Sequence, residues 1–175
     1  MDSLYIIGFP SLYGGAGAEL YHQIKVWRHM CVDIHLIPTQ KNVHRAELYP
    51  EMVGQGVTVH EGYDWSAIPE GAPVISFCNE EFLTALPEIR KRTRRTVFVN
   101  CMTWLFGSEK EAMKRGDISL FLYQNDRVRK NMMPRLRALN ADPSIRFMTF
   151  KPYFDTTDFC LLYTSPSPRD AHESR

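Results

Sequence analysis

Residues 3 to 20, SLYIIGFPSLYGGAGAEL, contain the pattern that decides the fold. The apolar run from Ser3 to Phe9 is typical of a buried strand, and Pro10 with the glycines after it ends that run. Beyond the glycines the apolar residues recur at helical spacing, as Leu20, Ile24 and Trp27. The stretch therefore predicts a strand, a glycine-rich turn and a helix in immediate succession.

The alternation of strand and helix patterns continues along the chain. Further helices are expected at 80–92, with a break or restart at Pro87, and at 126–139, with Asp126 as the cap. Further strands are expected at residues 32–38, 57–60, 73–78, 96–101, 118–123 and 145–150. Short, nearly continuous apolar strands separated by helices are typical of a parallel sheet covered on both faces. The fold class predicted is α/β, a Rossmann-like, doubly wound and mainly parallel sheet.

The composition narrows the class of protein. The chain has 175 residues, which suits one domain, and its net charge of +1 gives no field that would attract nucleic acid. No apolar run is long enough to span a membrane, and Asp2 stands where a secretory signal needs a cation. The four cysteines lack CxxC spacing, which indicates reduced thiols. We expect a cytoplasmic protein.

The glycines at 14, 15 and 17 lie where a ligand phosphate could bind. Glycines between a strand and a helix let backbone N–H groups approach a ligand, and the helix N-terminus adds partial positive charge. A dinucleotide would need a third glycine, but Leu20 occupies that position, and Pro38-Thr39-Gln40 after the second expected strand contains no acid for a ribose. A turn of purely structural purpose remains an alternative.

Four segments together resemble family-4 glycosyltransferases of the GT-B fold. The turn Gly14 to Leu20 resembles that family's "GGA-E" turn, and the strand after the helix, 31–37, is similar except that Cys31 replaces a glycine. Residues 123–129 resemble the segment that begins the last helix of the family's first domain. Residues 151–159 resemble an "N-G-V-D-x-x-x-F" element before the second domain, with Tyr153 and Phe154 as departures. The resemblance spans roughly residues 4 to 159.

The resemblance implies that residues 1–159 form the N-terminal, acceptor-side domain of a retaining glycosyltransferase. Such enzymes transfer a sugar from a nucleotide-sugar to a glycan, lipid or protein acceptor, as in cell-envelope polysaccharide synthesis. They need no metal or other cofactor. The second domain, which holds the nucleotide-sugar and an acidic pair, would be missing, so this fragment should be inactive alone. A stand-alone Rossmann-like module that binds a nucleotide or a protein is the alternative.

The candidate site residues follow from the turn and from the strand ends. Gly14, Gly15 and Gly17 are expected to bind the donor phosphate or sugar. Strand ends at the carboxyl edge supply candidate cleft-lining residues, and the turn itself adds one. These are Tyr13, Asn100, Thr103, Trp104, Tyr123 and Asn125. Catalytic residues stay unknown, because the resemblance places them in the second domain.

Several other features favour structural interpretations. Glu80 and Glu81 are expected in the first turn of a helix, where acids are stabilised by the helix dipole. No histidine forms a ligand-spaced pair with a carboxylate or a cysteine, so no metal site is expected. The basic run from Arg90 to Arg95 resembles a solvated helix end, and contact with an anionic membrane surface is the alternative.

The last sixteen residues, 160–175, differ from the rest of the chain. The string CLLYTSPSPRD has no strand or helix period and resembles the in-frame translation of a sequencing adapter. A natural Ser/Pro-rich tail is the alternative. We therefore expect a non-native or disordered segment here, following a domain whose reading frame continued past Phe159.

Overall fold

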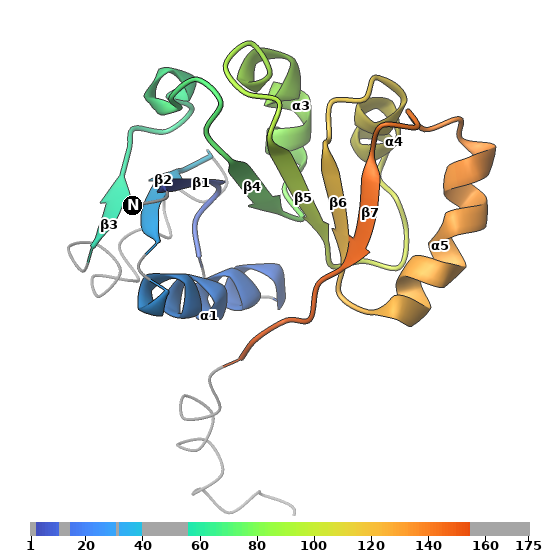
Figure 1. The fold of residues 1–175 in the computed structure, drawn as a ribbon, viewed down its shortest axis with the longest axis horizontal. Coiled ribbons are helices and arrows are strands. Elements are labelled where there is room, and N and C mark those ends of the chain that lie inside the picture. Colours follow the sequence, from blue (N-terminus) through green and yellow to red (C-terminus); the bar gives the residue numbers. More distant parts are fainter. Residues whose placement is uncertain (1–2, 11–14, 31, 40–55, 155–175) are drawn as a thin grey trace, which may run out of the picture.

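The computed structural model describes residues 3–10, 15–30, 32–39 and 56–154 of the 175-residue chain. Figure 1 shows them as an α/β domain built around one sheet. The proposed boundary at residue 159 and the tail after it lie outside the described residues.

A seven-stranded sheet forms the centre of the domain, and every pair of neighbouring strands is parallel. The strand order is β3-β2-β1-β4-β5-β6-β7. Each expected strand is present, shorter than expected by a residue or more. The strands are β1 Ser3–Ile7, β2 Asp33–Ile37, β3 Val57–Val59, β4 Val74–Phe77, β5 Thr96–Asn100, β6 Leu120–Tyr123 and β7 Arg146–Thr149. The predicted fold class, a Rossmann-like α/β sheet, is confirmed.

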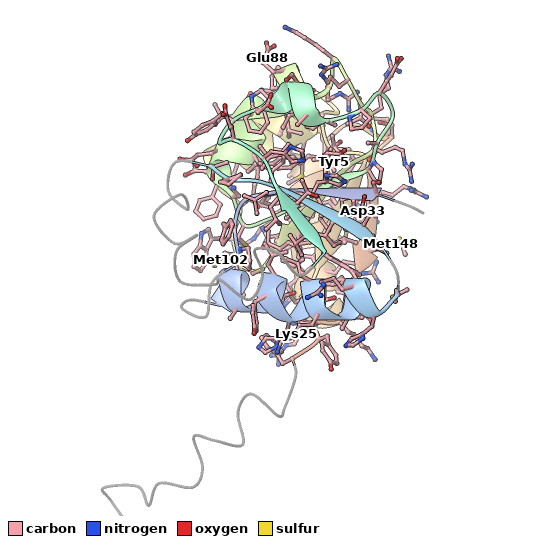
Figure 2. The ribbon with its side chains drawn as sticks, turned by 90° about the vertical axis from the view of Figure 1, so that its left-hand side faces the viewer. Tyr5, Lys25, Asp33, Glu88, Met102 and Met148 are labelled. Atoms are coloured by element: carbon pink, nitrogen blue, oxygen red, sulfur yellow. The ribbon has the colours of Figure 1, made fainter. Side chains whose placement is uncertain are left out.

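Helices cover both faces of the sheet. The helix α1 (Gly15–His29) packs on one face, while α3 (Glu80–Ile89), α4 (Gly107–Lys114) and α5 (Asp126–Ala138) contribute to the core on the other. Figure 1 shows α1 on the opposite side of the sheet from α3. Figure 2 shows Lys25 of α1 and Glu88 of α3 pointing away from the sheet in opposite directions. The domain is therefore doubly wound, as expected from the strand patterns.

Two buried clusters, one on each face, hold the layers together. On the α3 side, the Phe82 ring stacks on Phe98 with centroids 6.2 Å apart, and the Phe98 ring packs against Phe121 in a tilted arrangement with centroids 5.5 Å apart. Beneath α1, Ile24 packs in the same cluster as Ile34 and Leu36 of β2. All of these side chains are fully buried. Large apolar side chains in such positions contribute about 1.5–3 kcal/mol each by burial.

The helices correct three sequence-based expectations. The helix α3 continues through Pro87 without a break; Pro87 lies in its last turn, and Leu83, Leu86 and Ile89 bury its apolar face. The cap of α5 is Asn125, whose Oδ1 accepts a hydrogen bond from the Val128 N–H at 2.9 Å, and not Asp126.

The third correction concerns α4, which the sequence pattern did not predict. The helix has only eight residues, and its buried apolar side chains are Ala112 and Met113 alone. A pair of adjacent apolar residues makes no helical stripe, so periodicity gave no signal. The short 3-10 helix at Trp65–Ala67 was likewise not expected.

Candidate functional site

The order of the strands places a topological switch point at the carboxyl ends of β1 and β4. The chain runs outward from β1 through β2 to β3, and then returns to the other side of β1 to form β4. The helices that follow β1 and β4 cover opposite faces of the sheet. Open α/β sheets bind ligands at such a switch point, because the two helices diverge there. The candidate site is therefore the region where β1 and β4 end.

The glycine turn leads to this switch point. Of the predicted phosphate-binding residues, Gly15 and Gly17 lie in the first turn of α1, while Gly14 and Tyr13 lie outside the described residues. Gly15 is exposed, and an added Cβ there would meet no atom within 4 Å. Packing therefore does not require a glycine at this position. No acid occupies the first turn of α1, so its positive end is not neutralised from within that turn.

Side chains at the ends of β1, β2 and β4 join these strands at the switch point. The Ser76 hydroxyl donates to the Ile7 carbonyl at 2.6 Å, and the Asn79 amide donates to the same carbonyl at 3.4 Å and to the Thr39 hydroxyl at 3.3 Å. The Asn79 Oδ1 also accepts a hydrogen bond from the Glu81 N–H, so Asn79 is the N-terminal cap of α3. These contacts hold the ends of the three strands together at the switch point. The prediction that Glu80 and Glu81 lie in a first helical turn is confirmed.

A buried acid lies behind the glycine turn. Glu19 of α1 is fully buried, and its Oε2 accepts hydrogen bonds from the Gln124 side-chain amide and, at 3.6 Å, from the Cys101 thiol. Its Oε1 has no partner among the described residues. Burial raises the pKa of this carboxyl, against the opposing effect of the two hydrogen bonds. One helix and the ends of two strands thus converge on a single carboxylate.

Two cysteines complete this arrangement. Cys78 follows β4 with a backbone φ of 44°, a left-handed conformation that is uncommon for a residue with a side chain. Its sulfur accepts a hydrogen bond from the Cys101 N–H at 2.8 Å. Both thiols are free and partly buried. No sequence pattern predicts the cluster of Glu19, Cys78, Cys101 and Gln124, since its members are far apart in the chain.

Two of the predicted cleft-lining residues are buried. The Asn100 amide donates to Glu109 Oε1 at 2.7 Å, and its Oδ1 accepts from the Met102 N–H at 2.6 Å. Glu109 Oε2 accepts from the Phe106 N–H, so this buried carboxylate ties the loop after β5 to α4. Burial raises the pKa of Glu109 to about 7. Tyr123 is fully buried, and burial with the nearby Glu109 charge raises its pKa. The structure thus places Asn100 and Tyr123 beneath the surface.

The remaining predicted cleft residues are exposed. Thr103 and Trp104 lie in the loop between β5 and α4, and Asn125 is engaged as the cap of α5. Trp104 borders a pocket of about 440 Å³ between α4 and α5, with Lys110 and Arg135 as its cations. This pocket lies on the α4–α5 side of the sheet, and the residues of the glycine turn do not line it. The structure therefore does not gather all the predicted residues at one place.

The basic run from Arg90 to Arg95 lies at the amino edge of the sheet, opposite the carboxyl edge. Figure 2 shows Met102 at the end of the sheet where α1 begins and Asp33 at the opposite end. The basic run precedes β5 and so lies at the amino edge, after α3 ends at Ile89. Arg90 donates to the Gly116 carbonyl at 2.6 Å, and Arg92 donates to the Ser66 carbonyl at 3.1 Å. These two arginines tie loops together and do not face the glycine turn.

His35 of β2 lies between Asp33 of the same strand and His60, the residue that follows β3. His35 Nδ1 and His60 Nε2 lie 3.0 Å apart, and His35 Nε2 lies 3.1 Å from Asp33 Oδ2. Tyr5 stacks on His35 with ring centroids 4.4 Å apart. The search for metal-ligand spacing in the sequence did not anticipate this contact between His35 and Asp33. Within the described ranges no group of three or more histidine, cysteine or acidic side chains is arranged to hold a metal.

Comparison of the chain with protein-family models, with curated proteins and with solved structures finds no match. None of the helices in the described part of the chain is both long and apolar enough to cross a membrane. The fold class and the geometry of the carboxyl edge are therefore the basis for a functional proposal.

Proposed function

We propose that the chain is the N-terminal, acceptor-side domain of a retaining, nucleotide-sugar-dependent glycosyltransferase of the GT-B type. One observation carries the proposal: α1, the first helix after β1, begins with Gly15 and Gly17 at the topological switch point, with Gly15 exposed and no acid in its first turn. A helix N-terminus at this position suits a diphosphate, since its N–H groups and its dipole both favour an anion. The resemblance of residues 4–159 to family-4 glycosyltransferases supplies the class of donor.

Two features favour a nucleotide-sugar over a dinucleotide, although the strand order suits both. Leu20, at the position of the third fingerprint glycine, is buried in the core beneath α1. The strand β2 ends at Ile37, and Pro38 and Thr39 follow it with no acid to accept a ribose hydroxyl. The buried Thr39 hydroxyl already accepts from Asn79. An NAD-dependent enzyme would therefore lack two of the contacts that define its site.

The proposed reaction needs a second α/β domain facing the carboxyl edge. In the proposal Gly14, Gly15 and Gly17 lie near the donor phosphates, and Thr103 and Trp104 border the acceptor side as exposed residues of the β5–α4 loop. The acceptor is a glycan, a lipid or a protein, and no metal takes part. We place the protein in the cytoplasm, with peripheral membrane contact when the acceptor is lipid-linked.

The alternative function is a stand-alone Rossmann-like module that binds a nucleotide or a protein. The observation that favours it is the closed packing behind the glycine turn, where Glu19, Gln124 and Cys101 contact one another. A module of this kind would bind its ligand without help from a second domain.

Amide chemical shifts in the ¹⁵N-labelled chain distinguish these functions. The chain is titrated separately with UDP-glucose, GDP-mannose and NAD⁺ up to millimolar concentrations. Weak, saturable shifts confined to Gly15, Gly17 and their neighbours with a nucleotide-sugar, and absent with NAD⁺, support the proposal. Tight binding, with a Kd of about 1 μM or below, supports the stand-alone module, because half a site should not bind so strongly. Shifts with NAD⁺ alone contradict the glycosyltransferase proposal.

A further inference from the structure

The two cysteines at the carboxyl edge are close enough to form a disulfide. The last residue pair of β4 and β5 is Phe77 with Val99, and the Cys78 N–H donates to the Val99 carbonyl at 3.0 Å. Cys78 and Cys101 therefore follow neighbouring strands with an offset of one residue. Neighbouring strands lie about 4.8 Å apart, and disulfides join Cα atoms separated by roughly 4.4–6.8 Å. The 2.8 Å contact from the Cys101 N–H to the Cys78 sulfur brings that sulfur against the partner residue.

The two thiols differ in their surroundings. The Cys78 sulfur accepts hydrogen bonds from Cys101, and these lower its pKa, against the opposing effects of burial and of the Glu19 and Glu109 charges. The Cys101 thiol donates, and its hydrogen bond with Cys78, burial and the Glu19 charge all raise its pKa. Thiolates are the nucleophiles in disulfide exchange. Cys78 is thus suited to attack first and Cys101 to attack second.

A base for the second thiol is already in contact with it. Glu19 Oε2 accepts from the Cys101 thiol at 3.6 Å. The Glu19 side chain is fully buried, and its Oε1 has no partner among the described residues. Burial raises the pKa of this carboxyl, so its affinity for a proton is greater than that of an ordinary glutamate. Gln124, which also donates to Oε2, holds the carboxylate in place.

We propose that Cys78 and Cys101 form a redox-active dithiol, which a low-molecular-weight disulfide such as oxidised glutathione converts to an intramolecular disulfide, with Glu19 as the base for Cys101. The Cys78 thiolate attacks one sulfur of the reagent, forming a mixed disulfide and releasing one glutathione thiolate. Glu19 accepts the Cys101 proton, the resulting thiolate attacks the Cys78 sulfur, and the second glutathione thiolate leaves. Two cysteine thiols are oxidised and one disulfide is reduced to two thiols. This site does not depend on the proposed glycosyltransferase function.

The experiment uses the whole chain with Cys31 and Cys160 replaced by serine, so that only the proposed pair remains. The reduced protein is incubated with oxidised glutathione at micromolar concentration, quenched with N-ethylmaleimide and mapped by peptide mass spectrometry. We expect a linked pair of peptides that contain Cys78 and Cys101. In the Cys101→Ser variant we expect glutathione to remain attached to Cys78.

The role of Glu19 is tested by the lifetime of the mixed disulfide. In Glu19→Gln we expect the glutathione adduct on Cys78 to form at the ordinary rate and to resolve about tenfold more slowly, because Cys101 lacks its base. Glu81→Gln is the matched control, because Glu81 is an acid in the first turn of α3 that forms no hydrogen bond with either thiol among the described residues. In this variant the adduct should resolve at the ordinary rate. Circular dichroism of each variant checks that the fold is retained.

Alkylation of the unmodified chain by iodoacetamide at pH 7 gives a test that needs no variant. We expect Cys78 to react at least about tenfold faster than Cys101, since the thiolate is the reactive form. Equal rates, cross-links only between different molecules, or no linked peptide pair at equilibrium would overturn the dithiol. Equal resolution rates in Glu19→Gln and Glu81→Gln would overturn the role of Glu19.

Discussion

Replacing Glu109 by glutamine should change how stability depends on pH. The Glu109 carboxylate is fully buried between the Asn100 amide and the Phe106 N–H. Burial raises its pKa from an ordinary 4.5 to about 7. A group with a raised folded-state pKa stabilises the fold below pH 4.5 and loses that contribution as the pH rises through 7. Wild-type stability should therefore fall across this interval, where the folded state binds the additional proton.

The magnitude follows from the two pKa values. The difference between 4.5 and about 7, at about 1.4 kcal/mol for each pH unit, corresponds to about 3 kcal/mol. Glutamine resembles the protonated acid in shape and charge, so Glu109→Gln should lack this loss. The free energy of unfolding of Glu109→Gln minus that of wild type should therefore increase by about 3 kcal/mol between pH 4.5 and pH 8. This change with pH does not depend on the size of the difference at pH 4.5.

Urea unfolding at pH 4.5, 6 and 8, followed by tryptophan fluorescence, measures the difference. Glu111→Gln in the same helix is the matched control, because Glu111 is exposed and forms a surface ion pair with Lys114 at 3.0 Å. Its difference from wild type should change by less than about 0.5 kcal/mol over the same range. A wild-type curve that runs parallel to that of Glu109→Gln would refute the reasoning about burial.

Substitutions at three further positions test other parts of the structure. Gly15→Ala should leave the free energy of unfolding within about 1 kcal/mol of wild type, because a Cβ there meets no atom within 4 Å, and it should weaken the nucleotide-sugar shifts in NMR titrations. A large loss of stability would mean that packing requires the glycine. Asn125→Ala should lower the free energy of unfolding in urea by about 1 kcal/mol through the lost cap of α5, whereas Asn125→Asp should retain most of the wild-type stability. Equal losses of stability in the two variants would contradict the capping role. The pKa of His60 is lowered by burial and by His35, so wild-type stability should fall as the pH drops below about 6.5. His60→Gln should remove that fall when melting temperatures are compared at pH 5 and 7.5. An unchanged pH dependence in the variant would contradict the assigned role of His60.

The central strands could be predicted from the sequence because they are largely buried on both faces, whereas the edge strands β3 and β7 are partly exposed. Runs such as Val74 to Phe77 have no solvent-facing positions, so apolar residues are continuous along them. The helix α4 could not be predicted, since Ala112 and Met113 are the only apolar residues on its buried face, which they share with Glu109. Packing by Leu83 and Leu86 compensates for the hydrogen bond that Pro87 cannot make, and the local proline rule does not weigh such packing.

The candidate site could be predicted only in part. The glycine turn is a local signal, and β1 and α1 are placed as that signal indicates. Asn100 was expected at the edge, but it lies on the same face of β5 as the core residue Phe98, so its side chain turns inward to Glu109. The convergence of Glu19, Cys78 and Cys101 depends on strand order and register, which a single sequence does not reveal.

Sugar transfer by the complete protein tests the central proposal most directly. The reading frame that contains this chain is extended at its source locus, expressed, and supplied with radiolabelled UDP-glucose or GDP-mannose and a membrane and glycan extract as acceptor. The proposal predicts a second α/β domain and transfer of label to the acceptor without added metal. It also predicts that a folded variant in which tryptophan replaces Gly15 transfers no label. A continuation without a second α/β domain, or a complete protein that oxidises or reduces substrates with NAD⁺ and transfers no sugar, would contradict it.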